Sequence, residues 1–163
     1  MARYSSVYAV PVPVPQGRLS IISRPRGNDW LDDELRALRY DGVTHVVSLL
    51  EPAEASDLGL TDEAAAAQRQ GLRCTNIPVR DRSVPSDPKA FRDHAFRLAQ
   101  SIRDGESLGI HCRQSVGRSS LLTIAILRHL GLDLDTAIAR VQGARGLPIP
   151  ETPEQLAWLR QAL

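Results

Sequence analysis

Cysteine is scarce in this chain of 163 residues, which contains only Cys74 and Cys112. Two cysteines are too few for a disulfide framework or a cysteine-based zinc site. No stretch approaches the roughly eighteen apolar residues of a membrane span, and the N-terminus has no signal-peptide core. Unpaired thiols and the lack of an export signal suit a reducing compartment. We therefore expect a cytoplasmic protein without a membrane span.

An excess of charge of either sign is also missing. The 20 Lys and Arg residues nearly balance the 19 Asp and Glu residues, which leaves a net charge of +1. Such a chain lacks the broad basic surface of proteins that bind nucleic acids or acidic membranes. Hydrophobic residues make up 42% and charged residues 24%, proportions typical of globular proteins. We expect one domain over residues 1–163, present as a monomer and without a nucleic-acid partner.

The most informative stretch of the chain is HCRQSVGRSS, from His111 to Ser120. It follows a short apolar run, 107–110, and precedes LLTIAIL (121–127), which is apolar almost all round. This order predicts a buried strand, a tight loop and a helix buried on every side. Such a loop directs backbone N–H groups and the positive end of the helix dipole toward one point. The stretch therefore predicts a phosphate-binding loop.

Two side chains of this loop favour nucleophilic chemistry. Cys112 opens the loop, and Arg118 lies in the first turn of the predicted helix. A thiol beside a helix N-terminus and a guanidinium is favoured as the thiolate, which is the nucleophilic form. The planar guanidinium can bind two phosphoryl oxygens at once. We expect Gly117 to let the backbone turn tightly beside the ligand, and Ser119 to donate a hydrogen bond to the sulfur.

The order His-Cys, five residues, Arg, Ser resembles the signature loop of the cysteine-based phosphatases, the superfamily of tyrosine-specific and dual-specificity enzymes. This resemblance implies that Cys112 accepts the phosphoryl group and that His111 orients the loop. Glycine is usual in these families at the position of Ser115, so the chain departs from the pattern there. The implied phosphate-binding residues are Arg113, Gln114, Ser115, Val116, Gly117 and Arg118.

A second polar loop, VRDRSVPSDP at 79–88, follows the predicted strand 73–79. If this strand is parallel to the one before His111, both loops leave the same end of the sheet. The sequence IPVRD resembles the start of the loop that carries the general acid in dual-specificity phosphatases, which implies that role for Asp81. Asp87 competes for it, but its position before a proline is better interpreted as a helix N-cap.

Several further residues have two interpretations. Gln155 has capping-box spacing from the threonine three residues before it. The same Pro-x-Thr-x-x-Gln element resembles one near the active site of small dual-specificity phosphatases, where Gln155 would position the hydrolytic water. Cys74 is either an inert buried thiol or a resolving partner for oxidised Cys112. Arg24 and Arg26 are either solvated or line a phosphate pocket.

Predicted strands near 45–50, 74–79 and 107–111 alternate with predicted helices. This pattern predicts an α/β fold with a central, mainly parallel sheet of four to five strands and helices on both faces. Residues 1–28 contain two short runs rich in β-branched residues, which predict edge strands or a loose hairpin followed by a loop.

The residues and the resemblance together predict a phosphomonoester hydrolase of the protein-tyrosine or dual-specificity type. It would act on a phosphorylated protein or peptide through a phosphocysteine on Cys112. We expect no metal or other cofactor, because Arg118 and the loop amides already neutralise the phosphate. Three alternatives remain open: a phosphoinositide or other non-protein phosphatase, a phosphate-binding pseudophosphatase module, and a rhodanese-like sulfurtransferase.

Overall fold

The computed structural model describes residues 4–163, so the first three residues of the segment 1–28 lie outside the described residues. A single 3-10 turn spans Asn28–Trp30. The strands and helices, in chain order, are β1 (Val7–Val10), β2 (Arg18–Ile22), α1 (Leu31–Tyr40), β3 (His45–Ser48), α2 (Pro52–Asp57), α3 (Glu63–Arg69), β4 (Arg73–Asn76), α4 (Pro88–Arg103), β5 (Ser107–His111), α5 (Arg118–His129), α6 (Leu134–Arg145) and α7 (Pro153–Ala162).

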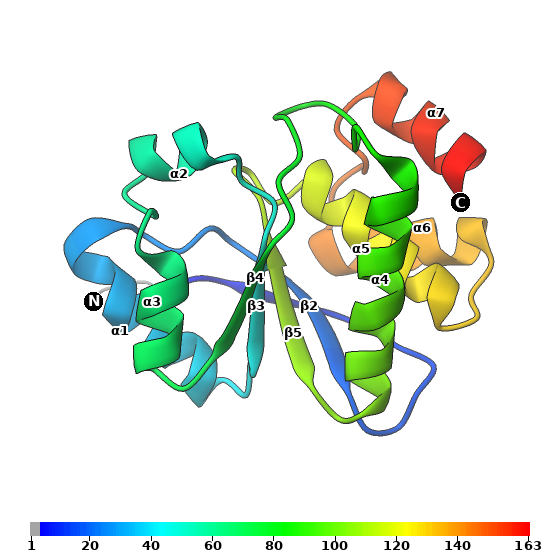
Figure 1. Ribbon diagram of the computed structural model, residues 1–163. Coiled ribbons are helices and arrows are strands. Elements are labelled where there is room, and N and C mark those ends of the chain that lie inside the picture. The colour runs from blue at the N-terminus through cyan, green and yellow to red at the C-terminus, as the bar shows by residue number, and fades with distance from the viewer. Residues whose placement is uncertain (1–3) are drawn as a thin grey trace.

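The strands form one mixed sheet in the order β1-β2-β5-β3-β4 (Figure 1). β1 and β2 are an antiparallel hairpin, and all the other neighbours are parallel. The predicted α/β fold, with a mainly parallel sheet, is confirmed. The N-terminal pair extends one side of the sheet as expected, but of these two strands only β1 lies at the edge. β2 is an inner strand, because it pairs with β5 and its residues from Leu19 to Ile22 are buried.

Helices cover both faces of the sheet, as predicted. α1, α2 and α3 lie to one side and α4, α5, α6 and α7 to the other (Figure 1). The first side buries a small core around Leu35, Val46 and Ala66. The second side buries a larger core that includes every apolar residue of α5 from Leu121 to Leu127. Each fully buried Leu or Ile contributes about 1.5–3 kcal/mol, so α5 is a firm support for the loop that precedes it.

The parallel strands place three chain segments at the same end of the sheet. Ser48 of β3 lies level with Asn76 of β4 on one side and with His111 of β5 on the other. Residues 112–118, here called the signature loop, follow β5, and residues 79–87, here called the Asp81 loop, come shortly after β4. Both lie at the upper end of the sheet in Figure 1. The fold therefore brings the two predicted loops together.

Two helices begin in ways that no motif discussed above indicates. α1 has no side-chain cap, and Asn28 and Asp29 form part of the 3-10 turn that precedes it. α2 is not among the elements predicted from the sequence. Pro52 is the first residue of this helix, and Glu51 and Glu54 form a reciprocal capping box around it. Proline is favourable at this position because its missing N–H needs no partner there.

Candidate active site

Carbonyl oxygens of the signature loop accept hydrogen bonds from the protein, whereas a run of its backbone N–H groups does not donate to any described residue. The carbonyl oxygen of Arg113 accepts a hydrogen bond from Arg24 Nη1 at 2.7 Å, and that of Ser115 accepts one from Arg145 Nε at 2.8 Å. Within residues 4–163, the backbone N–H groups of 113–117 have no protein acceptor. A row of free N–H groups at the start of a helix is a binding site for an oxyanion.

Ser115 explains how the loop closes without the usual glycine. Its φ is 55°, in the left-handed region, and its side chain is buried. That conformation costs roughly 1–2 kcal/mol for a residue with a Cβ. The Ser115 hydroxyl donates to the carbonyl oxygen of Ile22 at 2.6 Å, which satisfies two buried polar groups and offsets this cost. The departure at Ser115 therefore leaves the loop's shape intact.

Gly117 is needed for a reason other than the one expected. Its φ is −83°, which any residue can adopt. A Cβ at this position would lie 2.8 Å from Gln155 Oε1 and 2.9 Å from Gln155 Nε2. Glycine therefore permits close packing against Gln155 rather than an unusual turn. Of the other loop residues, Val116 packs partly against the larger core and Gln114 is exposed.

Cys112 lies at the start of the loop with polar groups on either side. Its Sγ atom is 3.4 Å from Ser119 Oγ. The ring of His111 is fully buried, with Nδ1 3.2 Å from the carbonyl oxygen of Cys112 and Nε2 2.6 Å from Glu63 Oε2. The ring thus bridges the backbone of Cys112 and a carboxylate from α3, and these two contacts fix its orientation beneath the loop.

Arg118 is buried, with 1% of its side chain exposed, and its guanidinium has several partners. Nη1 donates to Glu54 Oε1 and to the carbonyl oxygen of Val79, both at 2.7 Å. Nη2 donates to Glu54 Oε2 at 3.0 Å and to Asp81 Oδ1 at 2.9 Å. Among the described residues, Nε–H has no acceptor. The guanidinium is thus held in one orientation, with Nε–H left for a ligand.

The charges around Arg118 support one another. Burial opposes the charge of Arg118, but its hydrogen bond to Glu54 and the negative charges of Cys112, Glu54 and Asp81 raise its pKa. Burial likewise opposes the charge of Glu54, yet hydrogen bonds from Arg118 and from the backbone of Glu51 keep its pKa below the usual 4.5. Arg118 and Glu54 therefore form a charged pair around neutral pH.

Asp81 is more loosely placed, with 42% of its side chain exposed and one ion pair, to Arg118. Its loop also contacts the start of α7, where Gln155 Nε2 donates to the carbonyl oxygen of Ser83 at 2.9 Å. Asp87 is the N-cap of α4, because its Oδ1 accepts a hydrogen bond from the N–H of Ala90 at 3.0 Å. Of these two aspartates, Asp81 is therefore the one that the fold brings to the signature loop.

The two arginines of the N-terminal segment do not line the loop as phosphate ligands, and neither is simply solvated. Arg24 supports the loop from outside through the carbonyl of Arg113. Arg26 pairs with Glu34 at 2.6 Å and stacks on the Trp30 ring. The Arg113 side chain remains at the rim, 40% exposed and 4.0 Å from Glu54.

Sequence reasoning missed two carboxylates of the site. Glu54 orients Arg118, and Glu63 orients His111. The spacing of Glu51 and Glu54 around Pro52 was a signal for α2, but it gave no indication of the partner of Glu54. Glu63 follows a helix start and looks like an ordinary first-turn acid. Both residues come from the helices on the other side of the sheet from α5.

Cys74 and Cys112 lie on opposite faces of the sheet. Cys74 packs against the core of α1 and α3, whereas Cys112 belongs to the larger core under α5. Burial, helped by the charge of Glu63, raises the pKa of Cys74 to about 12. Cys74 therefore stays a neutral thiol, and its position favours the inert interpretation.

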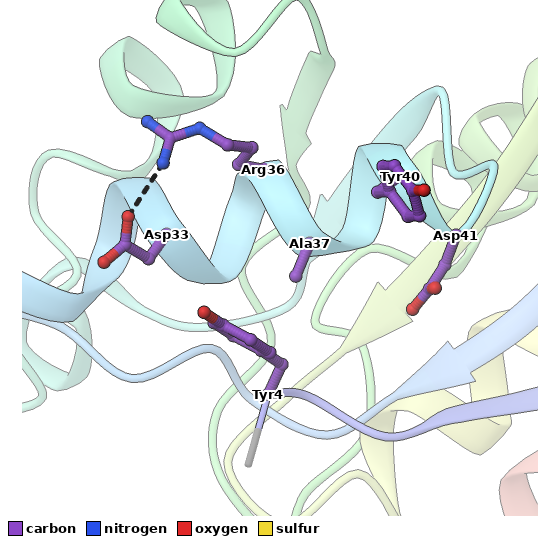
Figure 2. Close-up of a pocket in the computed structure, with 6 residues that line it drawn as sticks. All are labelled: Tyr4, Asp33, Arg36, Ala37, Tyr40 and Asp41. Carbon is purple, nitrogen blue, oxygen red and sulfur yellow. Dashed lines mark hydrogen bonds and ion pairs between the residues drawn. The ribbon is translucent and has the colours of Figure 1, made fainter. Parts of the chain in front are cut away.

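A separate hollow of about 340 Å³ lies beside α1 and contains none of the predicted site residues (Figure 2). Its one ion pair joins Arg36 Nη1 to Asp33 Oδ1 at 2.9 Å. The hollow is lined by Tyr4, Asp33, Arg36, Ala37, Tyr40 and Asp41.

Within the described part of the chain, no group of His, Cys, Asp and Glu side chains is arranged to hold a metal ion. No helix in that part is long and apolar enough to cross a membrane.

Comparison with protein families identifies the kind of protein to which this site belongs. The family described as "Polymorphic toxin system, DSP-PTPase phosphatase" matches residues 21–131, more than half of the chain. The chain belongs to this family. The matched range of this DSP-PTPase phosphatase includes both loops, α2, α3 and all of α5. The predicted resemblance to the cysteine-based phosphatases is confirmed. No curated protein sequence matches the chain.

Solved structures show that this DSP-PTPase phosphatase shares its fold with known phosphatases. Kinase-associated phosphatase, with its catalytic-site cysteine replaced by serine, matches with a TM-score of 0.89 at 18% identity, over 99% of this chain and 95% of that one. Tk-PTP in its active form matches with a TM-score of 0.76 at 25% identity, over 95% of both chains. Human DUSP28 matches with a TM-score of 0.60 at 22% identity, over 77% of this chain and 80% of that one.

Proposed function

We propose that this phosphatase hydrolyses phosphomonoesters through a phosphocysteine on Cys112, with Asp81 as general acid and then general base. The main support is the arrangement at Arg118. Arg118 is the last residue of the signature loop and comes directly after its free N–H groups. Asp81 Oδ1 lies 2.9 Å from Arg118 Nη2. A nucleophile, an anion site and a carboxylate are thus assembled at one end of the sheet.

In the first step, the Cys112 thiolate attacks phosphorus in line with the ester oxygen. An S–P bond forms and the P–O bond to the leaving group breaks, while Asp81, protonated at this stage, gives its proton to the leaving oxygen. Arg118 and the loop N–H groups hold the charge of the transferred group. Such preorganised donors usually make the largest contribution to catalysis.

In the second step, water attacks the phosphocysteine. Asp81, now a carboxylate, takes a proton from the water as a P–O bond forms and the S–P bond breaks. The sulfur leaves as a thiolate, and Ser119 Oγ, 3.4 Å from Sγ, donates a hydrogen bond to it. General acid–base assistance of this kind typically contributes about 10²–10⁴-fold.

Substrate binding changes the partners of Arg118. Four of its five N–H groups already donate to Glu54, Val79 and Asp81. A phosphoryl group that binds in bidentate fashion accepts hydrogen bonds from Nε–H and from the Nη2 hydrogen that now donates to Asp81. The incoming dianion therefore displaces Asp81 from Arg118, and this frees the carboxyl group to face the leaving oxygen.

The substrate class that we propose is a phosphoprotein or phosphopeptide. It carries phosphotyrosine and, if the enzyme is of the dual-specificity type, also phosphoserine or phosphothreonine. The signature loop contains no lysine, and its rim charge comes from Arg113, whose side chain is 40% exposed. A non-protein phosphate ester and a role limited to phosphate binding are the alternatives. Retention of both Cys112 and Asp81 favours turnover over binding alone.

The test is the hydrolysis of an aryl phosphate in the presence of a chelator by the wild type, Cys112→Ser and Asp81→Asn. We expect the serine variant to be inactive but to bind phosphate. Asp81→Asn should lose about 10²–10⁴-fold in kcat/KM for esters with poor leaving groups. It should also bind inorganic phosphate several times more tightly, since it removes a negative charge beside Arg118. Phosphorylated peptides and lipids, compared under the same conditions, separate the substrate classes.

Two results would contradict the proposal. If Cys112→Ser hydrolysed the ester as fast as the wild type, cysteine would not be the nucleophile. If the wild type bound phosphate but showed no turnover of any ester, the protein would be a phosphate-binding module. Loss of wild-type activity in the chelator would indicate a metal requirement.

A further inference from the structure

Gln155 lies between the two loops of the site and is completely buried. On one side, its carboxamide packs against Gly117 of the signature loop so closely that a Cβ there would be 2.8 Å from Oε1. On the other side, its Nε2 donates to the carbonyl oxygen of Ser83 in the Asp81 loop at 2.9 Å. This one side chain therefore contacts both the segment that binds phosphate and the segment that carries the acid.

The partners of the carboxamide determine which way it faces. Oε1 accepts hydrogen bonds from the backbone N–H groups of Glu151, at 3.0 Å, and Thr152, at 3.2 Å. A flipped carboxamide would place its NH₂ group against these two donors and its oxygen against the Ser83 carbonyl, so the observed orientation is the favourable one. A carbonyl oxygen has two lone pairs, and both are used here.

Because both lone pairs of Gln155 Oε1 are occupied, the part that Gln155 can play in the reaction is limited. A water molecule that attacks phosphorus must point its hydrogens at acceptors, one of which is Asp81. Gln155 has no acceptor left for the other hydrogen unless the capping box at the start of α7 opens. The free Nε2–H, a donor, cannot replace it. The contacts of Gln155 therefore fit a different role.

We propose that Gln155 is a positioning residue that holds the Asp81 loop against the signature loop, so that Asp81 is in place for the first chemical step. This inference rests on the proposed function, since it assigns Gln155 to the acid step rather than to the attack of water. A second contact acts at the same place: Arg82 Nη1 pairs with Glu151 Oε1 at 2.6 Å, with Arg82 63% exposed. The start of α7 thus meets the Asp81 loop at two points.

Gln155→Glu separates the loop contact from the helix cap. Glutamate at this position of a capping box accepts the same backbone N–H groups, so α7 keeps its start. The second oxygen of the glutamate then faces the Ser83 carbonyl, and the hydrogen bond to the Asp81 loop is lost. Thr152→Ala is the matched control. It removes the hydroxyl that accepts from the N–H of Gln155 at 3.1 Å and leaves the contact with Ser83.

The readout is the ratio of kcat/KM for p-nitrophenyl phosphate, which has a good leaving group, to kcat/KM for phenyl phosphate, which has a poor one. A misplaced acid slows only the poor leaving group. The added charge of Gln155→Glu weakens binding of both esters equally and cancels in the ratio. We expect the ratio to rise about tenfold in Gln155→Glu, part of the full contribution of a general acid, and to stay unchanged in Thr152→Ala. In an Asp81→Asn background, Gln155→Glu should add little, because both changes act on the same step.

A water-positioning role has a different signature. Gln155→Ala would then release a burst of p-nitrophenol followed by slow turnover, because phosphocysteine would accumulate, and the ratio of the two esters would not change. That result would overturn the proposal, as would an unchanged ratio without a burst.

Hydrogen exchange keeps the test independent of turnover. The amides of residues 80–86 should exchange faster in Gln155→Glu than in the wild type and Thr152→Ala, since local opening of the loop becomes easier. Equal exchange in all three proteins would overturn the proposal. If exchange rises but the wild type hydrolyses no ester, the loop contact stands and the proposed function fails.

Discussion

The signature loop and the Asp81 loop meet at Arg118, but the protein holds them in different ways. Most of the signature loop is buried, and it is bonded to β2 through Ser115, to Arg24 through Arg113, and to α6 through Arg145. Most of the Asp81 loop is exposed. Between its two ends, its polar contacts with the rest of the site include the Asp81–Arg118 pair and the two contacts with the start of α7.

This difference corresponds to two chemical tasks. An anion site works best when its donors are already oriented before the substrate arrives, because no free energy is then spent on reorientation during the reaction. A general acid must approach the leaving group and then turn to a water molecule, and loops with few contacts are suited to such movement. In the mechanism that we propose, the more rigid signature loop binds the charged phosphoryl group and the looser Asp81 loop transfers the proton.

The largest effect on activity should come from changing Arg118 in the more rigid signature loop. Arg118→Lys keeps a positive charge but cannot bind Glu54 and two phosphoryl oxygens in one plane. We expect kcat/KM for an aryl phosphate to fall by about 10²–10³-fold or more, with the circular dichroism spectrum unchanged. A fall of less than tenfold would mean that a positive charge alone, without the planar guanidinium, is sufficient for catalysis.

Glu54 tests whether the rigid side depends on a carboxylate from α2. Glu54→Gln should lower the free energy of unfolding at pH 7 by about 2 kcal/mol, since Arg118 loses its charged hydrogen-bond partner. The folded-state pKa of Glu54 lies below 4.5, so its contribution is present above pH 4.5 and is lost as the pH falls through the lowered value. Urea unfolding at several pH values should show the two proteins converging on the acid side. A constant difference down to pH 3 would contradict this assignment.

Ser115 allows a sharper test of how the rigid loop is closed. Ser115→Ala keeps the left-handed strain and leaves the Ile22 carbonyl without its donor, so we expect a loss of about 1–2 kcal/mol. Ser115→Gly loses the same hydrogen bond but relieves the roughly 1–2 kcal/mol of strain. The glycine variant should therefore unfold close to the wild type in urea. If Ser115→Ala were more stable than Ser115→Gly, the left-handed backbone conformation of Ser115 would not be a source of strain.

The smallest effect should come from the exposed ion pair of the looser loop. Arg82→Gln removes the contact with Glu151, and an exposed pair of this kind is worth roughly 0.2–1 kcal/mol. We expect less than a twofold change in kcat/KM for phenyl phosphate at 0.15 M salt, and no difference from the wild type at 1 M salt, where the pair is screened. A larger, salt-independent loss would place Arg82 in the site itself.

The sequence itself determined the parts of this protein that depend on local order. Apolar runs and helical periodicity located β3, β4, β5 and α5. The spacing of Cys112, Arg118 and Ser119 predicted a phosphate-binding loop between a strand and a helix, and a capping position distinguished Asp87 from Asp81. The strand, the helix and the N-cap at Asp87 are confirmed, because such elements are formed by residues close together in the chain.

Only the tertiary structure decided which distant groups support that loop. Glu54 is 64 residues from Arg118, and Glu63 is 48 residues from His111. Ser115 acquires its hydrogen-bond partner from Ile22, 93 residues away. Gln155 meets Ser83 across 72 residues. No local sequence pattern indicates such pairs. Each pair forms where the packing of helices against the sheet excludes the water that would otherwise bind these groups. Buried charges and hydrogen-bonding groups then need partners within the protein.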